Sequence, residues 1–484
     1  MGVSFSANKI VSSVTDYVSG VKRKRENTED EEIQKIIDIA LHTPKRKKLE
    51  STTKYIYQAL FEEGKNSDVT VCALDEEFYL HKIYLSQSPY FASMFGGSWN
   101  ESTKNYINID VVNPLITVES LRVVFGSLYD NEIILNPLSI VPIIATATMF
   151  QLETLIEKCT EVMLETINPK TSLDYYNAAC QYGVIKLQEV CFKWFLVNLM
   201  TYYFTHPLTN LKTIPIDLME KLISHPDLFV MQTEYSIYVM LKYWMYLRMN
   251  DECPVQEISS KTINTYFSSR KGELPFLLSN EGKKFAPAFR GLRLHNLLSQ
   301  KQDIELIFQD NIIPQFWINP IVMQQWKDVL RVDQNEDKGP NNIENEFFLH
   351  NSLRCGRVLK VKERHVWRWT GFHFGMDLIM FTDGVTLSIK RNNRSEYGQL
   401  LSLQSTRYVV IRVTVAKLNE QGQIEYSKET EILNIALTKG EEYELLKLDE
   451  SLEYPIIISA NIQYTSPDVV SSEGKQLSIT QVVP

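Results

Sequence analysis

The period of the hydrophobic pattern changes at a polar stretch in the last third of this chain, and that change constrains the fold more than any other feature. Apolar residues recur mostly at helical spacing up to about Trp326, whereas short apolar and β-branched runs separated by turns begin near Val358. A polar stretch at residues 333–342 separates the two patterns. The chain therefore combines helical and β-rich modules, and its 484 residues fit about two to four domains.

The segment after the polar stretch is predicted to form a β-rich, sandwich-like domain over residues 347–484, preceded by a linker at 333–346. Turn residues such as Asp383-Gly384 and Asn392-Asn393 punctuate its apolar runs, as in an antiparallel sheet. The runs predict strands at residues 358–361, 378–382, 385–390, 408–416, 431–437 and 456–464. We therefore expect a multidomain α+β protein.

Residues 1–51 are predicted to form a flexible arm that carries targeting signals. Met1-Gly2-Val3-Ser4-Phe5-Ser6 fits the N-myristoylation pattern, with Gly2 as the acceptor and Ser6 at the favoured position. One myristoyl chain holds a membrane only marginally, so a second signal is required. The arm contains two basic runs: Lys22, Arg23, Lys24 and Arg25, then Lys45, Arg46, Lys47 and Lys48. The first run can supply the second membrane signal, and both runs have the density of nuclear-import signals. The alternative is a solvated tail without a partner.

Short helices and strands alternate between the arm and residue 167. Helical spacing is present at residues 55–60, in a segment that ends near Tyr129, and twice within residues 138–167. The intervening runs predict strands at residues 68–73, 76–80, 106–109 and 132–135. This order indicates a small α/β domain over residues 52–167.

This domain closely resembles the BTB/POZ signature, which it matches through Ser67-Asp68-Val69, His81-Lys82, Ser88-Pro89-Tyr90-Phe91 and Met94-Phe95. The resemblance implies homodimerisation, with the first helix packing against a partner subunit. By the same resemblance, Asp68 and Lys82 correspond to the family's charged pair near the dimer interface. The alternative is an ordinary core ion pair, because two buried charges are tolerated only when they meet. His81 belongs to the signature, and we expect it to make a structural hydrogen bond.

Trp99-Asn100-Glu101 follows the signature and matches the hydrophobic-x-Glu motif with which cullin-binding BTB domains engage cullin-3. A tryptophan in a surface loop exposes apolar area whose burial by a partner stabilises a complex, and Glu101 can accept hydrogen bonds. The alternative is that Trp99 folds back onto its own domain. Met149 and Phe150, at a later helix–helix corner, are further cullin-3 candidates, with a core position as the alternative.

Residues 168–250 are predicted to be all helical, with helices near 216–224 and 234–248, and residues 251–332 to form a mixed helical connector. The position after a BTB segment and the motif Cys191-Phe192-Lys193-Trp194-Phe195 resemble the BACK domain of cullin-3 adaptors. The resemblance implies that this domain extends the cullin contact and sets the distance to a substrate module.

The Met-Gly motif, the basic runs, the BTB and BACK segments and the tail around Trp367-Arg368-Trp369 together resemble the germ cell-less family over essentially the whole chain. The resemblance implies a cullin-3 substrate adaptor in germ-cell formation. It places the protein in the nucleus, at the nuclear envelope or inner nuclear membrane, and at some stages at the plasma membrane or in the cytoplasm. The alternative is a nuclear-envelope scaffold or transcriptional co-regulator that uses its BTB domain only to dimerise.

The sequence offers only candidates for binding the recruited protein substrates. Trp367, Trp369 and Phe372 can form an aromatic patch, although aromatic strands also fill cores. Arg391 and Arg394, in a basic hairpin, can contact an acidic segment, although exposed turns are commonly charged.

No pattern in the sequence predicts catalysis. The motifs of phosphate-binding loops, serine hydrolases and zinc proteases are absent, and the eight histidines and six cysteines form no recognisable ligand set. We therefore expect no catalytic residue, metal or cofactor, and ubiquitin chemistry from the cullin's own enzymes. A formal net charge of −9 opposes binding to nucleic acid. No apolar run approaches the ~20 residues that span a bilayer, so an intracellular protein is expected.

Overall fold

The computed structural model describes most of the chain after the N-terminal arm. The residues that it describes are 52–96, 104–130, 132–204, 208–250, 259–270, 274–298, 301–333, 343–369, 378–391, 406–438 and 440–465. The proposed targeting residues of the arm, from Gly2 to Lys48, lie outside these ranges.

The first domain is a three-stranded sheet covered by helices. Its strands are β1 (Val69–Ala73), β2 (Glu76–Leu80) and β3 (Tyr106–Ile109), in the order β2-β1-β3. Val71 lies opposite Phe78 in the antiparallel pair and opposite Ile107 in the parallel pair, so alternate residues enter the core. The helices are α3 (Thr52–Ile56), η1 (Tyr57–Glu62), α4 (Lys82–Leu85), α5 (Pro89–Gly96), α6 (Val118–Gly126), α7 (Ile140–Met149) and α8 (Glu153–Glu165).

The strand predicted at residues 132–135 is wrong. The described residues of this segment belong to no strand, and the side chain of Ile134 is 94% exposed, while Leu135 packs against the core. The β-branched run indicates an extended backbone, but a strand also needs a neighbour, and the sheet ends at β2 and β3.

Every regular element that the structure describes between residues 168 and 351 is a helix. The sequence placed two of its helices almost to the residue, α11 and α12. The elements are α9 (Ser172–Tyr182), α10 (Ile185–Asn198), η3 (Leu199–Tyr203), η4 (Leu208–Thr213), α11 (Ile216–Ser224), α12 (Glu234–Met249), α13 (Ser260–Ser268), η6 (Phe276–Leu278), η7 (Lys283–Phe285), α14 (Ala286–Arg290), α15 (Leu294–Leu297), α16 (Lys301–Asp310), α17 (Gln315–Asp333) and α18 (Asn345–Asn351).

One hydrophobic core extends through these helices into the BTB domain, from Val69 of β1 to Ile318 of α17. The helices before and after residue 250 therefore share apolar contacts. The domain boundaries suggested by the sequence at residues 167, 250 and 332 stay predictions. This core continues across residues 167 and 250, and a second core begins beyond residue 332, at Leu353.

The C-terminal part is a two-sheet β module, as predicted. One sheet has the order β10-β8-β12-β4 with β9 beside β8, the other β11-β7-β6-β5, and both contribute to a second core. The strands are β4 (Leu353–Leu359), β5 (His365–Arg368), β6 (Leu378–Thr382), β7 (Thr386–Arg391), β8 (Thr406–Leu418), β9 (Ile424–Glu429), β10 (Leu433–Thr438), β11 (Glu442–Lys447) and β12 (Ile456–Thr465). The prediction missed β5, β9 and β11.

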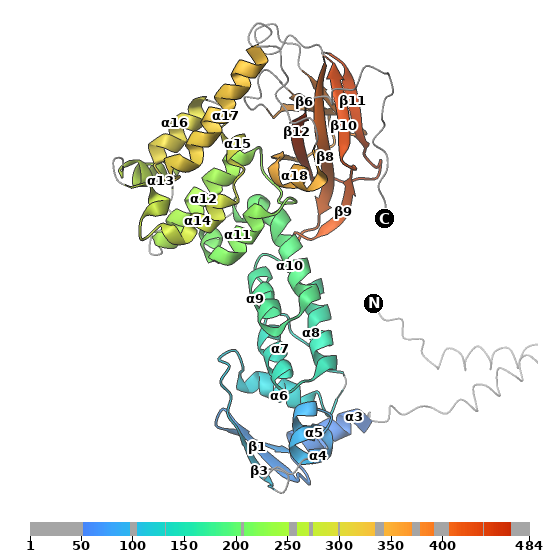
Figure 1. Ribbon diagram of the computed structural model, residues 1–484. Coiled ribbons are helices and arrows are strands. Elements are labelled where there is room, and N and C mark those ends of the chain that lie inside the picture. Colours follow the sequence, from blue (N-terminus) through green and yellow to red (C-terminus); the bar gives the residue numbers. More distant parts are fainter. Residues whose placement is uncertain are drawn as a thin grey trace, which may run out of the picture.

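Figure 1 shows how these parts are arranged. The sheet of the first domain lies at one end with α3 to α6, and the last two helices of that domain, α7 and α8, continue with α9 and α10 as a stem. At the far end of the stem, a helical lobe that contains α11 to α17 lies beside the β module, with α18 between them.

Candidate protein-interaction sites

The signature histidine joins three segments of the BTB domain. The Nε2 of His81 lies 2.9 Å from the carbonyl oxygen of Lys65, and its Nδ1 lies 3.1 Å from the hydroxyl of Tyr129. A carbonyl only accepts, so Nε2 carries a proton and donates. The backbone N–H of His81 also donates to the Tyr129 hydroxyl over 3.0 Å, and burial raises the pKa of that hydroxyl. The contacts are those of a structural residue.

Asp68 and Lys82 do not form a buried core pair, because Asp68 is exposed. The Asp68 carboxylate accepts a hydrogen bond of 2.7 Å from the backbone N–H of Lys82, at the first residue of α4. The ammonium of Lys82 lies 5.5 Å from the ring centroid of Phe95. Asp68 therefore holds the start of a helix, where negative charge is favoured.

Trp99 and Glu101 lie outside the described residues, in the connection between α5 and β3. Helix α5 leads into this connection, and contacts at its first turn hold it against the rest of the domain. The Ser88 hydroxyl, which precedes α5, donates to the carbonyl of Phe150 over 2.6 Å. Within the helix, the ring of Phe91 stacks on the rings of Phe150 and Phe95, at 5.2 and 5.9 Å. The first turn of α5 is thus tied to the corner between α7 and α8, and Phe95 extends the stack along the helix.

The two candidates at that corner differ in accessibility. The ring of Phe150 is fully buried among other aromatic rings, with Phe125 at a centroid distance of 5.2 Å. In this conformation it cannot touch another protein. Met149 is only partly buried and packs against the core. The surface available to a partner at this corner therefore includes Met149 and not Phe150.

Most aromatic and basic candidates of the β module are inaccessible. Trp367 and Trp369 are 4% and 3% exposed, and their rings meet at 5.7 Å within the second core. Arg391 is buried at the end of β7, and burial lowers its pKa. Phe372 and Arg394 lie outside the described residues. Burial argues against direct substrate contact by Trp367, Trp369 and Arg391. The two tryptophans belong to the second core.

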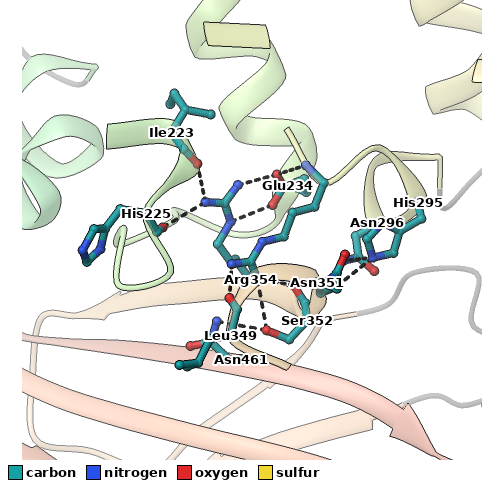
Figure 2. Close-up of polar contacts among 11 residues, drawn as sticks. Ile223, His225, Glu234, His295, Asn296, Leu349, Asn351, Ser352, Arg354 and Asn461 are labelled. Atoms are coloured by element: carbon teal, nitrogen blue, oxygen red, sulfur yellow. Dashed lines mark hydrogen bonds and ion pairs between the residues drawn. The ribbon is translucent and has the colours of Figure 1, made fainter. Parts of the chain in front are cut away.

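A buried ionic network joins the helical lobe to the β module (Figure 2). Glu234, the first residue of α12, is fully buried and receives two hydrogen bonds from Arg354 of β4. These bonds are 2.6 Å, from Nη2 to Oε1, and 3.1 Å, from Nε to Oε2. The backbone N–H of Arg293 donates to the same Oε1 over 2.8 Å. Sequence analysis missed this network, because a glutamate in a first helical turn is usually solvated.

The arginines of the network also bind backbone oxygens. Arg354 donates from Nη1 to the carbonyls of Ile223 and His225, at 2.7 and 3.3 Å. The Arg293 guanidinium donates to the carbonyls of Leu349 and Ser352, in and just after α18. Burial by itself raises the pKa of Glu234, but Arg354 and Arg293 outweigh burial and hold that pKa below its usual value. Glu234 is therefore ionised and paired at neutral pH.

Backbone contacts close the same junction. Gln232 exchanges two hydrogen bonds with Gly356 of β4, of 2.9 and 3.3 Å between nitrogen and oxygen, so the helical lobe covers the outer edge of β4. A Cβ at Gly356 would lie 2.2 Å from the carbonyl oxygen of Val230, which is too close for any side chain. This position therefore requires glycine. Further along, the indole of Trp194 donates to the carbonyl of Gln421 over 3.0 Å. The stem, the helical lobe and the β module thus form one connected body.

Two kinds of feature are absent from the described ranges. No helix there is long and apolar enough to cross a membrane. No group of three or more histidine, cysteine, aspartate and glutamate side chains is placed there to hold a metal ion.

Comparison with known proteins identifies the family. Residues 57–167 match the BTB/POZ domain. The chain is 42% identical over 473 residues to "Protein germ cell-less" of Drosophila melanogaster, covering 92% of this chain and 83% of the fly protein. It is 40% identical over 435 residues to human "Germ cell-less protein-like 1", covering 88% and 84%. "Kelch repeat and BTB domain-containing protein 8" of Xenopus tropicalis is 24% identical over 213 residues, covering 43% and 33%. The chain belongs to the germ cell-less family of BTB/POZ proteins.

Proposed function

We propose that this protein is a substrate-recognition adaptor of a cullin-3 ubiquitin ligase. It dimerises through its BTB domain and recruits target proteins through its C-terminal half. The observation that supports this function best is the arrangement in Figure 1, in which the BTB domain and the β module lie at the two ends of one body. The buried Glu234 network makes the far end rigid. A ligase adaptor contributes proximity and orientation, which such a body provides.

The cullin-3 contact is assigned to Trp99 and Glu101, and to Met149 at the α7–α8 corner. The connection that carries Trp99 and Glu101 follows α5, a short helix whose first turn Ser88 and Phe91 hold against the α7–α8 corner. A loop that starts from a fixed point presents its side chains at lower entropic cost than a free one. The tryptophan supplies apolar area for burial and the glutamate supplies an acceptor.

Dimerisation is assigned to the first helices of the BTB domain, which leave apolar surface uncovered. The side chain of Tyr55 on α3 is 63% exposed, and Leu60 and Phe61 of η1 are only partly buried. A second copy of the chain that covers this surface removes it from water. The germ-cell role belongs to the same proposal and is suggested by the names of the relatives.

The place of action is assigned to the nuclear envelope and the nucleus, with membrane contact through the N-terminal arm. A myristoyl group on Gly2 and the basic runs beginning at Lys22 and Lys45 provide two weak signals that act together. The same basic runs can direct nuclear import.

Titration of the purified chain with the N-terminal domain of cullin-3 tests the adaptor role. Loss of the indole in Trp99→Ala removes about 2 kcal/mol of interface energy and weakens binding about thirtyfold. Glu101→Lys adds to that loss by reversing the charge of the acceptor. The controls are Trp326→Ala on α17, where the indole is 59% exposed, and Glu441→Lys before β11, and both should bind as the wild type does.

Two outcomes contradict the proposal at different levels. Wild-type affinity in the Trp99→Ala, Glu101→Lys double variant removes the assignment to this loop. Failure of the wild-type chain to bind cullin-3 at micromolar concentration removes the adaptor role, and favours a nuclear-envelope scaffold or transcriptional co-regulator that uses the BTB domain only to dimerise.

A further inference from the structure

The β8–β9 hairpin reaches from the β module to the stem, near the end of α10 (Figure 1). Most inward residues of β8 belong to the second core, but Ala416 and Leu418, close to the turn, pack with the first core. The turn itself, residues 419–423, is called the hairpin tip here. On one side of the tip, the Nε2 of Gln423 donates to the carbonyl of Leu164 on α8 over 3.2 Å. The hairpin thus links the two cores.

On its other side the hairpin tip presents backbone oxygens to the last turn of α10. The indole Nε1 of Trp194 donates to the carbonyl of Gln421 over 3.0 Å, and the Nδ2 of Asn198 donates to the carbonyl of Gly422 over 2.8 Å. The same Nδ2 also donates to the carbonyl of Trp194 over 2.8 Å. The two side chains are only 4% and 3% exposed. A buried donor without an acceptor is costly, so this end of α10 is suited to hold the tip.

The hairpin tip has a fixed shape of its own. The side-chain oxygen of Asn419 accepts hydrogen bonds from the backbone N–H groups of Gln421 and Gln423, at 3.0 and 2.9 Å. Gly422 has a φ of 78°, in the left-handed region that favours glycine. A Cβ at Gly422 would lie 2.6 Å from the Oδ1 of Asn198. The contact therefore depends on a preformed turn and on a glycine that lets α10 approach it.

This contact lies where the chain leaves the stem for the helical lobe. Asn198 is the last residue of α10, and the π-helix η3 (Leu199–Tyr203) follows it directly. Short π-helical turns are rare and frequently occur at functional sites. The β module is attached on both sides of this turn, to the stem through the hairpin tip and to the lobe through Glu234 and Arg354. A module attached on both sides of a bend fixes the angle of the bend.

We infer that the β8–β9 hairpin is a brace that fixes the angle between the stem and the helical lobe. Trp194 and Asn198 are positioning residues, because they set the orientation of the β module relative to the BTB domain without belonging to the proposed cullin-3 contact. The brace itself follows from these contacts alone. Its purpose, a constant geometry between cullin-3 and a recruited protein, rests on the proposed adaptor function.

Single-molecule energy transfer within the full-length chain measures this angle. The fluorophores are attached through unnatural amino acids, because the chain contains six cysteines. Labelled chains are diluted in unlabelled protein, so that only distances within one chain are seen. The stem–module pair joins Glu157 on α8 to Glu444 on β11, and the lobe–module pair joins Lys261 on α13 to Glu444. All three side chains are exposed.

Gly422→Ala should free the stem from the β module. The new Cβ displaces the amide of Asn198, and the distance distribution of the stem–module pair should become at least about twice as wide, since modules joined by small contacts move relative to one another. The lobe–module pair should keep its width, because the Glu234 network is intact. Trp194→Phe removes the donor but keeps an aromatic ring, and it should act in the same direction.

Each variant has a matched control. Gly440 also has a positive φ, of 84°, but a Cβ there meets nothing within 4 Å, so Gly440→Ala imposes similar backbone strain without touching the stem. Trp244 is buried in the helical lobe and donates to the carbonyl of Ile214 over 3.1 Å. Trp244→Phe therefore removes an equivalent hydrogen bond away from the hairpin. Both controls should keep the wild-type width in both pairs.

Three results overturn the inference. A stem–module distribution that stays as narrow in Gly422→Ala and Trp194→Phe as in their controls shows that the hairpin does not set the angle. Equal broadening of the lobe–module pair shows that these residues hold the β module together and not its orientation. Equal broadening in the controls assigns the effect to strain. Trp194→Phe decides the question if Gly422→Ala fails to fold. Failure of the chain to bind cullin-3 would remove the purpose of the brace and leave these measurements unchanged.

Discussion

Replacement of Arg354 by methionine should open the junction between the helical lobe and the β module. The guanidinium makes two hydrogen bonds to Glu234 and one each to the carbonyls of Ile223 and His225. Without it, Glu234 keeps only the backbone N–H of Arg293 as a donor among the described residues. Breaking a buried ion pair from one side costs about 3–5 kcal/mol. Each carbonyl left unpaired adds about 1–3 kcal/mol. Protonation of Glu234 limits the total, so we expect the free energy of opening the junction to fall by about 3–5 kcal/mol.

Amide hydrogen exchange measures this opening where it occurs. The N–H groups of Gln232 and Gly356 donate to each other's carbonyl across the junction, so they exchange only when the junction opens or the chain unfolds. A loss of about 3 kcal/mol accelerates their exchange by more than about a hundredfold. Protection of the β1 amides, in the BTB domain, should change much less.

Lys390→Met is the matched control within the β module. Lys390 pairs with Glu442 at 2.9 Å, but the two side chains are 34% and 54% exposed, and such a pair contributes about 0–1 kcal/mol. Exchange at Gln232 and Gly356 should therefore stay near wild type. If Arg354→Met accelerates exchange no more than Lys390→Met does, the buried network does not hold the junction and the reasoning is refuted.

Three further predictions follow from individual residues. The pKa of Glu234 is lowered in the folded chain, so its contribution to stability is present above about pH 4.3 and is lost as the pH falls through the lower folded value. The protection factor of the Gly356 amide, which corrects for the pH dependence of intrinsic exchange, should therefore fall only in acid, and a fall near neutral pH would contradict this. Phe150→Ala should destabilise the BTB domain by about 3–5 kcal/mol, measured as lost hydrogen-exchange protection of the β1 amides. Met149→Ala should cost clearly less, because Met149 is only partly buried, and equal losses in the two variants would contradict this. Gly2→Ala should release the protein from membrane fractions without changing its thermal unfolding, and fractionation like wild type would exclude the lipid anchor.

Elements with a strong local signal were predictable from the sequence. Helix α11 agrees with its predicted bounds because Leu218, Met219, Leu222 and Ile223 form one apolar face and all four are buried. Strand β6 agrees because alternate residues enter the core. The BTB segment was identifiable because its residues resemble the family signature, although their contacts, such as that of His81 with Tyr129, join residues 48 positions apart.

Features that depend on distant partners were not predictable. Strand β9 pairs with β8 and has no fully buried residue, so its sequence lacks an apolar pattern. The run at residues 132–135 has the composition of a strand but finds no neighbour among the described residues. Glu234 and Arg354 are 120 positions apart, and nothing near either residue indicates their pairing.

The central claim is that a dimer of this chain carries cullin-3 at its BTB ends while its C-terminal modules stay free to hold other proteins. Sedimentation of the purified full-length chain with the N-terminal domain of cullin-3 tests it most directly. The account predicts a complex of two chains with two cullin-3 domains, reduced to the bare dimer by Trp99→Ala with Glu101→Lys. A wild-type dimer that sediments unchanged in excess cullin-3 would contradict it.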